Sequence, residues 1–363
     1  MTTGDKEWWV DWQTTDVTPP TSSVTTPALA ARPTFLVAWS GADAQSGVKM
    51  FDLQVRDGPG GSWTPWLTAT TQTSALFNGA LAHTYYFQSR AHDWSGNVEV
   101  YPGGNGSGVT TTPQYVLSGQ VLGSRDQPVA VAQVQAAPPV LGPALSDAWG
   151  GFKLYAHVTG TTTLTVSRTG FGPLPAMEQV AVNEIAPGPT FYLPPLNDTI
   201  ANGQFESSDL SGWAVAGEVT PIMTTTAHTG LYGAQLGDMT GHSMPAHSTL
   251  SQILTWPDPT TATLSLLYRT AVMNPMSSTL TIYVAGPVDP LTLTLPALTL
   301  PLTGTDWMHV WLDVPASFAP TVTVSIDLYT TDPVAGSAVV VDEVSLGPAV
   351  VGSYPVFLPL VTR

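Results

Sequence analysis

Apolar and polar residues alternate along most of the chain, and this alternation predicts strands rather than helices. Phe35, Val37 and Trp39 alternate with Leu36 and Ala38, and the same pattern recurs over residues 279–284 and 307–314. Successive side chains of a strand point to opposite faces, so one set enters a core and the other stays outside. Turn clusters separate these runs at a spacing of roughly 8–12 residues, which is typical of β-sandwiches. We therefore expect an all-β protein.

Composition supports extracellular β-modules. The 363 residues have room for two to four domains. Only 10% of residues are charged, against about a quarter in ordinary globular proteins. Solubility must then come from Thr, Ser, Asn and Gln, as in many extracellular proteins whose strands are rich in Thr. We expect an extracellular or cell-surface location.

The charge balance excludes some partners. The net charge of −16 comes from 26 acidic residues against 10 Lys and Arg. Nucleic acid and anionic membranes need clustered cations, so neither is expected as a partner. Excess carboxylates suit divalent cations, although simple solvation of the surface is the alternative. No apolar run is long enough for a membrane span, since Pro interrupts even Leu291–Leu302. Cysteine is absent.

Composition shifts divide the chain into five parts. The Pro- and Gly-rich tracts 102–113 and 187–195 are expected to be linkers. The predicted parts are an extended N-terminal segment, three sandwiches and an extended C-terminal segment, over residues 1–16, 17–112, 113–195, 196–348 and 349–363.

The first predicted sandwich resembles bacterial fibronectin type III-like repeats. The run from Thr84 to Ala91 matches the strand that begins with the tyrosine corner of that family, here Tyr85. Trp39 stands at the family's core Trp position. The resemblance implies a sandwich of the immunoglobulin or fibronectin type.

The second predicted sandwich resembles carboxypeptidase regulatory-like domains, which have a transthyretin-type fold. The resemblance rests on Gly119-Gln-Val121, Ser146-Asp147 and Gly150-Gly-Phe152. It implies that the final strands of this module lie around residues 164–166 and 170–171.

The third predicted sandwich resembles the galactose-binding-like jelly rolls of carbohydrate-binding modules. The matching pieces are Asn202-Gly-Gln-Phe-Glu206, Gly212-Trp213, Ala227-His-Thr-Gly230 and Val341-Asp-Glu-Val344. The resemblance implies a carbohydrate or a cell-surface polymer as the partner.

Calcium is the one cofactor that this resemblance suggests. In the jelly-roll family, a Glu of the opening strand and an Asp of the closing strand share a structural calcium ion, and Glu206 and Asp342 occupy those positions. The alternative is two carboxylates at strand ends. Asp16 and Asp93 are weaker calcium candidates, because Asp93 and Asn97 also suit a self-capped turn.

Outward-facing aromatic residues are the candidates for sugar binding. Alternation places Trp307 and Trp311 on the face opposite the core, and Tyr283 outside on what we expect to be a neighbouring strand. Flat rings stack on the C–H patches of a pyranose, and Arg269 would add a polar arm. The alternative is that loops or the next module cover this face.

Catalytic signatures are absent from the sequence. No G-x-S-x-G, H-E-x-x-H, G-x-G-x-x-G or Walker motif occurs. His242 and His247 flank a loop without a third zinc ligand nearby, so solvated histidines are expected there. The sequence thus favours a non-catalytic adhesive or carbohydrate-binding protein. Its alternatives are a structural subunit of a filament or surface layer, and the accessory tail of a secreted hydrolase.

The two ends of the chain carry separate expectations. Trp9-Val-Asp-Trp12 matches Trp63-Thr-Pro-Trp66, so residues 1–15 look like the end of a preceding repeat, and Met1 is expected to lie partway through a longer gene. Two W-x-x-W spacings can also coincide by chance. Residues 7–17 and 350–361 are both apolar and extended, and we expect pairing strands that dock on their own modules or link copies into a filament.

Overall fold

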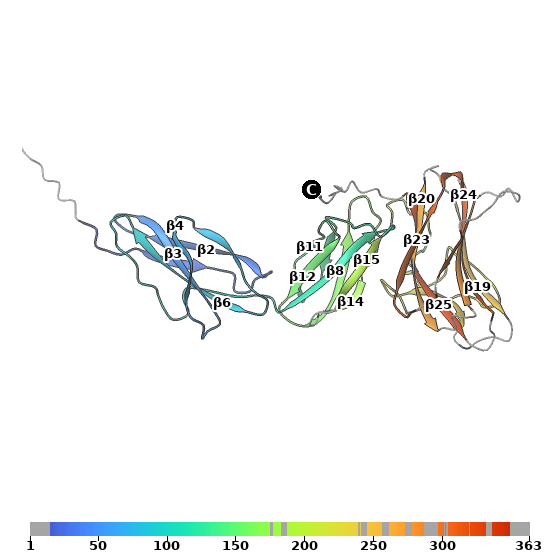
Figure 1. The fold of residues 1–363 in the computed structure, drawn as a ribbon, viewed down its shortest axis with the longest axis horizontal. Helices are drawn as coiled ribbons and strands as arrows, with labels where there is room; N and C mark the ends of the chain where they lie inside the picture. The colour runs from blue at the N-terminus through green and yellow to red at the C-terminus, as the bar shows by residue number, and fades with distance from the viewer. Residues whose placement is uncertain are drawn as a thin grey trace, which may run out of the picture. The chain divides into compact units, whose positions relative to one another are not determined.

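A computed structural model of the protein describes most of the chain outside its two ends. The described residues are 15–174, 177–182, 187–238, 240, 245–255, 261–272, 278–286, 297–300, 302, 304–318, 320–331 and 336–348. The chain divides into two compact units, residues 1–116 with 155–158 and residues 117–154 with 159–363. Strands dominate both units (Figure 1), and the described part contains one short 3₁₀ turn, η1 (Ala316–Phe318). The all-β prediction is confirmed. No helix of the described part is long and apolar enough to cross a membrane.

The first sandwich packs a three-stranded sheet on a four-stranded one. The sheet orders are β1-β2-β5 and β4-β3-β6-β7. The strands are β1 (Thr21–Thr25), β2 (Thr34–Ala42), β3 (Val48–Asp57), β4 (Thr64–Thr70), β5 (Ser74–Asn78), β6 (Thr84–Asp93) and β7 (Gly108–Thr111). The predicted linker at 102–113 is therefore wrong in its second half, because β7 pairs with β6 in the sheet.

An aromatic core joins the two sheets of the first sandwich. Trp39 and Phe87 are buried there, as the alternation predicts. The Tyr85 hydroxyl accepts a hydrogen bond of 2.9 Å from the backbone N–H of Ala80, five residues upstream. This contact is the arrangement expected of a tyrosine corner.

The second sandwich has two four-stranded sheets, ordered β10-β12-β8-β15 and β11-β9-β13-β14. Its strands are β8 (Tyr115–Gly123), β9 (Gln133–Ala136), β10 (Val140–Leu141), β11 (Ala144–Leu145), β12 (Gly151–Ala156), β13 (Gly160–Ser167), β14 (Met177–Val182) and β15 (Pro187–Leu193). The predicted spacer at 187–195 is wrong, because β15 pairs in parallel with β8. Proline is compatible with this strand because β15 lies at the sheet edge.

The third sandwich packs two five-stranded sheets around the largest core. The orders are β16-β19-β24-β21-β22 and β17-β18-β25-β20-β23. The strands are β16 (Ala214–Ala216), β17 (Ile222–Thr224), β18 (Gly233–Asp238), β19 (Ala246–Thr255), β20 (Ala262–Val272), β21 (Ser278–Ala285), β22 (Ala297–Leu300), β23 (Met308–Val314), β24 (Thr321–Thr330) and β25 (Ser337–Pro348). Figure 1 shows β19 and β24 in one layer and β20, β23 and β25 in the other.

Strand alternation in the third sandwich follows the prediction. Leu280, Ile282 and Val284 of β21 are buried in the core, whereas Tyr283 is exposed. In β23 the apolar set packs against the same core and Trp311 faces outward. However, β21 and β23 belong to different sheets. The expectation that Tyr283 and Trp311 lie on neighbouring strands is therefore wrong.

Several predictions fall outside the described residues. They include the pairing roles of residues 1–14 and 350–361, the W-x-x-W segment, and His242 with most of its loop. His247 is described, and it lies within β19 rather than in a loop.

A buried carboxylate in the first sandwich yields the first testable prediction. Asp52 accepts hydrogen bonds of 2.9 Å from the Ala69 N–H and the Arg90 side chain, and pairs with His92 at 2.9 Å. Burial alone would raise its pKa, but the bonds from Ala69, His92 and Arg90 outweigh burial and lower the pKa of Asp52. The folded state thus gains stability above pH 3.8, which is lost as the pH falls through the lowered pKa.

Asp52→Asn should therefore destabilise the first sandwich by about 1–3 kcal/mol at pH 7, and the difference from the parent should shrink below pH 4. Urea unfolding at pH 3 and pH 7 would measure both effects. Asp57→Asn is the matched control, because its pair with His83 is exposed and worth at most about 1 kcal/mol. Equal losses for the two variants would contradict a special role of Asp52.

Candidate functional site

Three of the four predicted sugar-binding residues belong to the sheet that contains β23. Trp311 is 41% exposed and pairs with Ser265 of β20. Trp307 immediately precedes β23. Tyr268 of β20 pairs with Met308 of β23, so Arg269, the residue after Tyr268, lies opposite Trp307. The structure thus brings Trp307, Trp311 and Arg269 to one outward face, and places Tyr283 on the opposite sheet.

Residues of the second sandwich cover this outward face within the same compact unit. Asp126 Oδ1 pairs with His309 Nδ1 at 2.7 Å, and Asp126 Oδ2 accepts a bond of 3.1 Å from Trp311 Nε1. Tyr192 stacks on the His309 ring, with 3.9 Å between their centroids. A module covers this face around Trp311, as the alternative expected, but it is the preceding module and not the next one.

Arg125 adds a second anchor to the same contact. Its guanidinium pairs with Asp313 at 2.7 Å, and its Nε donates to Thr263 at 2.9 Å. The guanidinium carbon also lies 6.0 Å from the centroid of the Trp311 ring. Trp311 is thereby held between two side chains of the second sandwich.

A buried polar cluster lies behind this contact. Glu343 accepts hydrogen bonds from Thr229 Oγ1 at 2.6 Å and pairs with His228 Nδ1 at 2.9 Å. Its φ of 51° marks a bulge where β25 shifts register against β20. Glu343 Oε2 and His309 Nε2 are both buried and have no hydrogen-bond partner in the described part of the chain.

Burial shifts the pKa values around this cluster. Burial, and then the charge of Glu343, raises the pKa of Asp342 well above its usual value, against bonds from three backbone N–H groups. Burial raises the pKa of Tyr192 to about 12, and the negative charges of Asp126 and Glu343 act in the same direction. Burial lowers the pKa of His309, although the Asp126 carboxylate opposes this shift.

The predicted calcium pair, Glu206 and Asp342, holds one loop from two sides. Glu206 Oε1 accepts bonds of 2.9 Å from the N–H groups of Leu231 and Tyr232. Asp342 Oδ2 accepts from His228 at 2.8 Å and Thr229 at 3.3 Å. The opening segment and the closing strand are thus joined through residues 228–232 by protein hydrogen bonds. Binding of calcium by this pair stays a prediction.

The weaker calcium candidates lie close together. One ligand oxygen each from Asp16, Asp43 and Asp93 falls within 4.8 Å of the others, the one such acidic group among the described residues. Ser46 N–H donates to Asp16, and Asn97 binds Asp93 through both its backbone and its side chain. The predicted self-capped turn at Asp93 is therefore present, and calcium binding there stays a prediction. Asp43 was missed because no motif marks it.

The opposite sheet presents the most regular outward face. In the register of β19, β24 and β21, three rows of directly opposed residues are polar or aromatic throughout, and the next row, Ile253, Thr323 and Ala285, is mainly apolar. The three polar or aromatic rows are His247, Tyr329 and Thr279; Thr249, Asp327 and Thr281; and Ser251, Ser325 and Tyr283. Tyr283 is the one predicted sugar-binding residue on this face.

Hydrogen bonds order the first two rows. Asp327 pairs with His247 Nδ1 at 2.9 Å and accepts a 2.6 Å bond from Thr249 Oγ1. The His247 ring stacks on Tyr329, with a centroid separation of 4.4 Å. Alternation within 321–330 would have placed Tyr329 and Asp327 outside, but sequence alone does not say which strands stand beside Tyr283.

Comparisons with known proteins found structural likeness only. No protein-family model matches the chain, and no curated protein matches it. The solved structure of TmCBM61 in complex with β-1,4-galactotriose is 16% identical, with 42% of this chain and 99% of that chain covered and a TM-score of 0.34. A structure of carbohydrate-binding modules from the β-sandwich superfamily is 10% identical, with coverage of 92% and 99% and a TM-score of 0.35. The CBM22-1 xylan-binding domain of Paenibacillus barcinonensis Xyn10C is 16% identical, with coverage of 40% and 90% and a TM-score of 0.29. The function is therefore inferred from the geometry of this chain itself.

The contact around Trp311 predicts a packing role for this residue. Trp311→Ala removes the bond to Asp126 and the ring beside Arg125, so it should destabilise the second unit by about 1–2 kcal/mol. Denaturant unfolding would measure the loss. Trp149→Ala is the control, because Trp149 is 75% exposed. A Trp311 variant as stable as the Trp149 variant, with loss of sugar binding, would restore the sugar-binding assignment of Trp311.

The calcium hypothesis predicts site-specific changes in thermal unfolding. A calcium ion bound only by the folded state raises the melting temperature, and a chelator should reverse that rise. Asp43→Asn should abolish the rise for the first sandwich, and Glu206→Gln should abolish it for the third. Unfolding that is identical with calcium and with chelator would exclude a structural ion at both places.

Proposed function

We propose that this is a non-catalytic, extracellular carbohydrate-binding protein, and that the outward face of β19, β24 and β21 is its binding surface. The observation that carries the proposal is the set of three residue rows on that face. In these rows the three strands present five Ser or Thr hydroxyls, two tyrosines, a histidine and the largely buried Asp327, and the exposed Ile253 continues the same face.

The chemistry of the rows suits a sugar. A pyranose offers C–H patches beside hydroxyl groups, so its binding sites combine flat rings with a few fixed polar groups. Tyr283 is 36% exposed and Tyr329 is partly exposed. They stand on adjacent strands four positions apart along the register, which corresponds to about 14 Å. That separation allows an extended chain of sugars to contact both rings.

Fixed polar groups lie beside the rings. Asp327 has its orientation set by His247 and Thr249, and a carboxylate with two bonds retains lone pairs for further donors. Such preorganisation lowers the entropy cost of binding.

The first and second sandwiches complete the modular interpretation. We propose that the first is fibronectin type III-like, supported by its sheet order and the Tyr85 contact, and that the second is carboxypeptidase regulatory-like. The third would be a galactose-binding-like jelly roll. The low charge fraction of 10% supports a location outside the cell. The filament and hydrolase-tail alternatives depend on chain ends outside the described residues, and no contact described above favours them.

The experiment compares sugar binding of the parent with that of Tyr329→Ala and Tyr283→Ala. A glycan array selects the oligosaccharide, and calorimetric titration then measures its affinity. Loss of one stacking ring should weaken binding about 5- to 50-fold, which corresponds to roughly 1–2 kcal/mol. Both side chains are outside the core, so unfolding should change little.

One control variant and one further variant of the surface complete the experiment. Trp149→Ala removes an exposed aromatic residue from another sandwich and should bind sugar like the parent. Asp327→Asn should weaken binding, because the fixed acceptor loses its charge. If both Tyr variants bind like the Trp149 control, the binding surface is elsewhere, and a parent without any glycan ligand would refute the proposal.

A further inference from the structure

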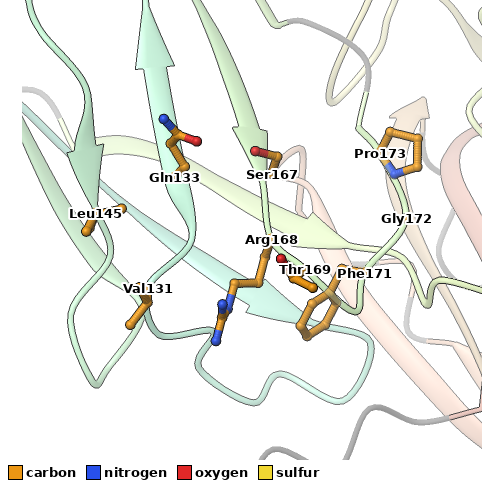
Figure 2. A pocket seen from close by; sticks show the side chains of 9 residues that line it. All are labelled: Val131, Gln133, Leu145, Ser167, Arg168, Thr169, Phe171, Gly172 and Pro173. Carbon is orange, nitrogen blue, oxygen red and sulfur yellow. The ribbon is translucent and has the colours of Figure 1, made fainter.

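The second sandwich carries an open groove that is separate from the third-sandwich surface. It lies where β9 begins and β11 and β13 end, and its volume is about 470 Å³. Leu145, Gln133 and Ser167 oppose one another across the three strands and form its floor. Figure 2 shows Arg168 extending from the strand end between Val131 and Phe171. This volume falls within the usual range for small-ligand sites, about 300–1,000 Å³.

Among the described residues, none forms a hydrogen bond or an ion pair with the Arg168 side chain. This side chain is exposed and makes no ring contact within the described part of the chain either. By contrast, Arg90 pairs with Asp52 and Arg125 pairs with Asp313. Carboxylates are plentiful on this chain, with 26 against 10 cations. An unpaired guanidinium in a groove is therefore open to an external anion.

Apolar side chains flank the guanidinium and are held in place. Val131 is 52% exposed and Leu145 is 61% exposed. Val131 adopts a φ of 57°, a strained conformation for a β-branched residue. Its N–H donates to the carbonyl of Ser146, which fixes this turn at 2.9 Å. The backbone of Phe171 forms an antiparallel β-bridge with Pro195.

We propose that this groove binds a uronic acid residue of an acidic polysaccharide. The planar guanidinium of Arg168 matches a carboxylate through two parallel hydrogen bonds. The Phe171 ring suits the C–H face of the sugar. Gln133, Ser167 and Thr169 add an amide and two hydroxyls for the ring hydroxyls.

A sugar fits this groove better than a peptide. Extended peptides gain affinity by adding a strand to a free sheet edge. The edge strand at this groove is β11, which has only two residues, Ala144 and Leu145. So short an edge offers too few backbone groups to hold an added strand. The site extends the proposed carbohydrate binding to a second sandwich and does not depend on the tyrosine surface.

Calorimetric titration of the full chain with a galacturonate trimer tests the proposal. The parent should bind the trimer, and its methyl ester, which lacks the charges, should bind at least about tenfold more weakly. Arg168→Gln should lose the same factor for the acidic form. Arg32→Gln removes one exposed cation from the first sandwich and should bind like the parent.

Further measurements separate the possible outcomes. Tyr283→Ala and Tyr329→Ala should leave trimer binding unchanged. The groove proposal can therefore be refuted while the tyrosine surface is supported, and the tyrosine surface can be refuted while the groove is supported. Thermal unfolding of Arg168→Gln should match the parent, because the side chain is exposed. The proposal is overturned if the parent does not bind the trimer, if the ester binds equally, or if Arg168→Gln binds like Arg32→Gln. Equal binding of a tri-aspartate peptide would also overturn it, since the groove would then recognise charge alone.

Discussion

The two-layer packing of a β-sandwich is the constraint on which the rest of this structure depends. Each strand contributes alternate side chains to the core, so only the other half remains available for recognition. The outward faces of the two sheets then point away from each other, and no ligand can contact both. In the third sandwich, one of these faces is covered around Trp311 by Arg125 and Asp126. The face of β19, β24 and β21 is consequently the one on which exposed rings and fixed polar groups coincide.

Local sequence patterns predicted much of the fold for the same reason. Alternation identifies which residues of a strand are buried, and it correctly placed Ile282 inside and Tyr283 outside. Sheet membership is a different property, because it depends on which distant strands pair. Consecutive strands β21 and β22 pair with each other, yet β23 joins the opposite sheet. No period in the sequence distinguishes these two outcomes.

Contacts between distant residues explain the rest of what the sequence could not show. Asp126 and Trp311 lie 185 positions apart, and their hydrogen bond decides whether the ring is open. Asp43 joins Asp16 and Asp93 only because the turn after β2 folds back toward them. The Pro-rich tract at 187–195 has the composition of a spacer, but an edge position in a parallel pair tolerates its prolines. Composition alone cannot reveal that position.

The distribution of cations distinguishes the two proposed binding surfaces. Arg56, Arg90 and Arg125 are all engaged with protein groups, through an amide, carboxylates and aromatic rings. The rows around Asp327 contain no Lys or Arg, and their one carboxylate would repel an acidic sugar. The groove of the second sandwich has the opposite character, because Arg168 is the one charged residue among its described lining residues. On the two proposals above, a neutral sugar suits the first surface and an acidic one the second, so the charge of a ligand would decide which of the two sandwiches it occupies.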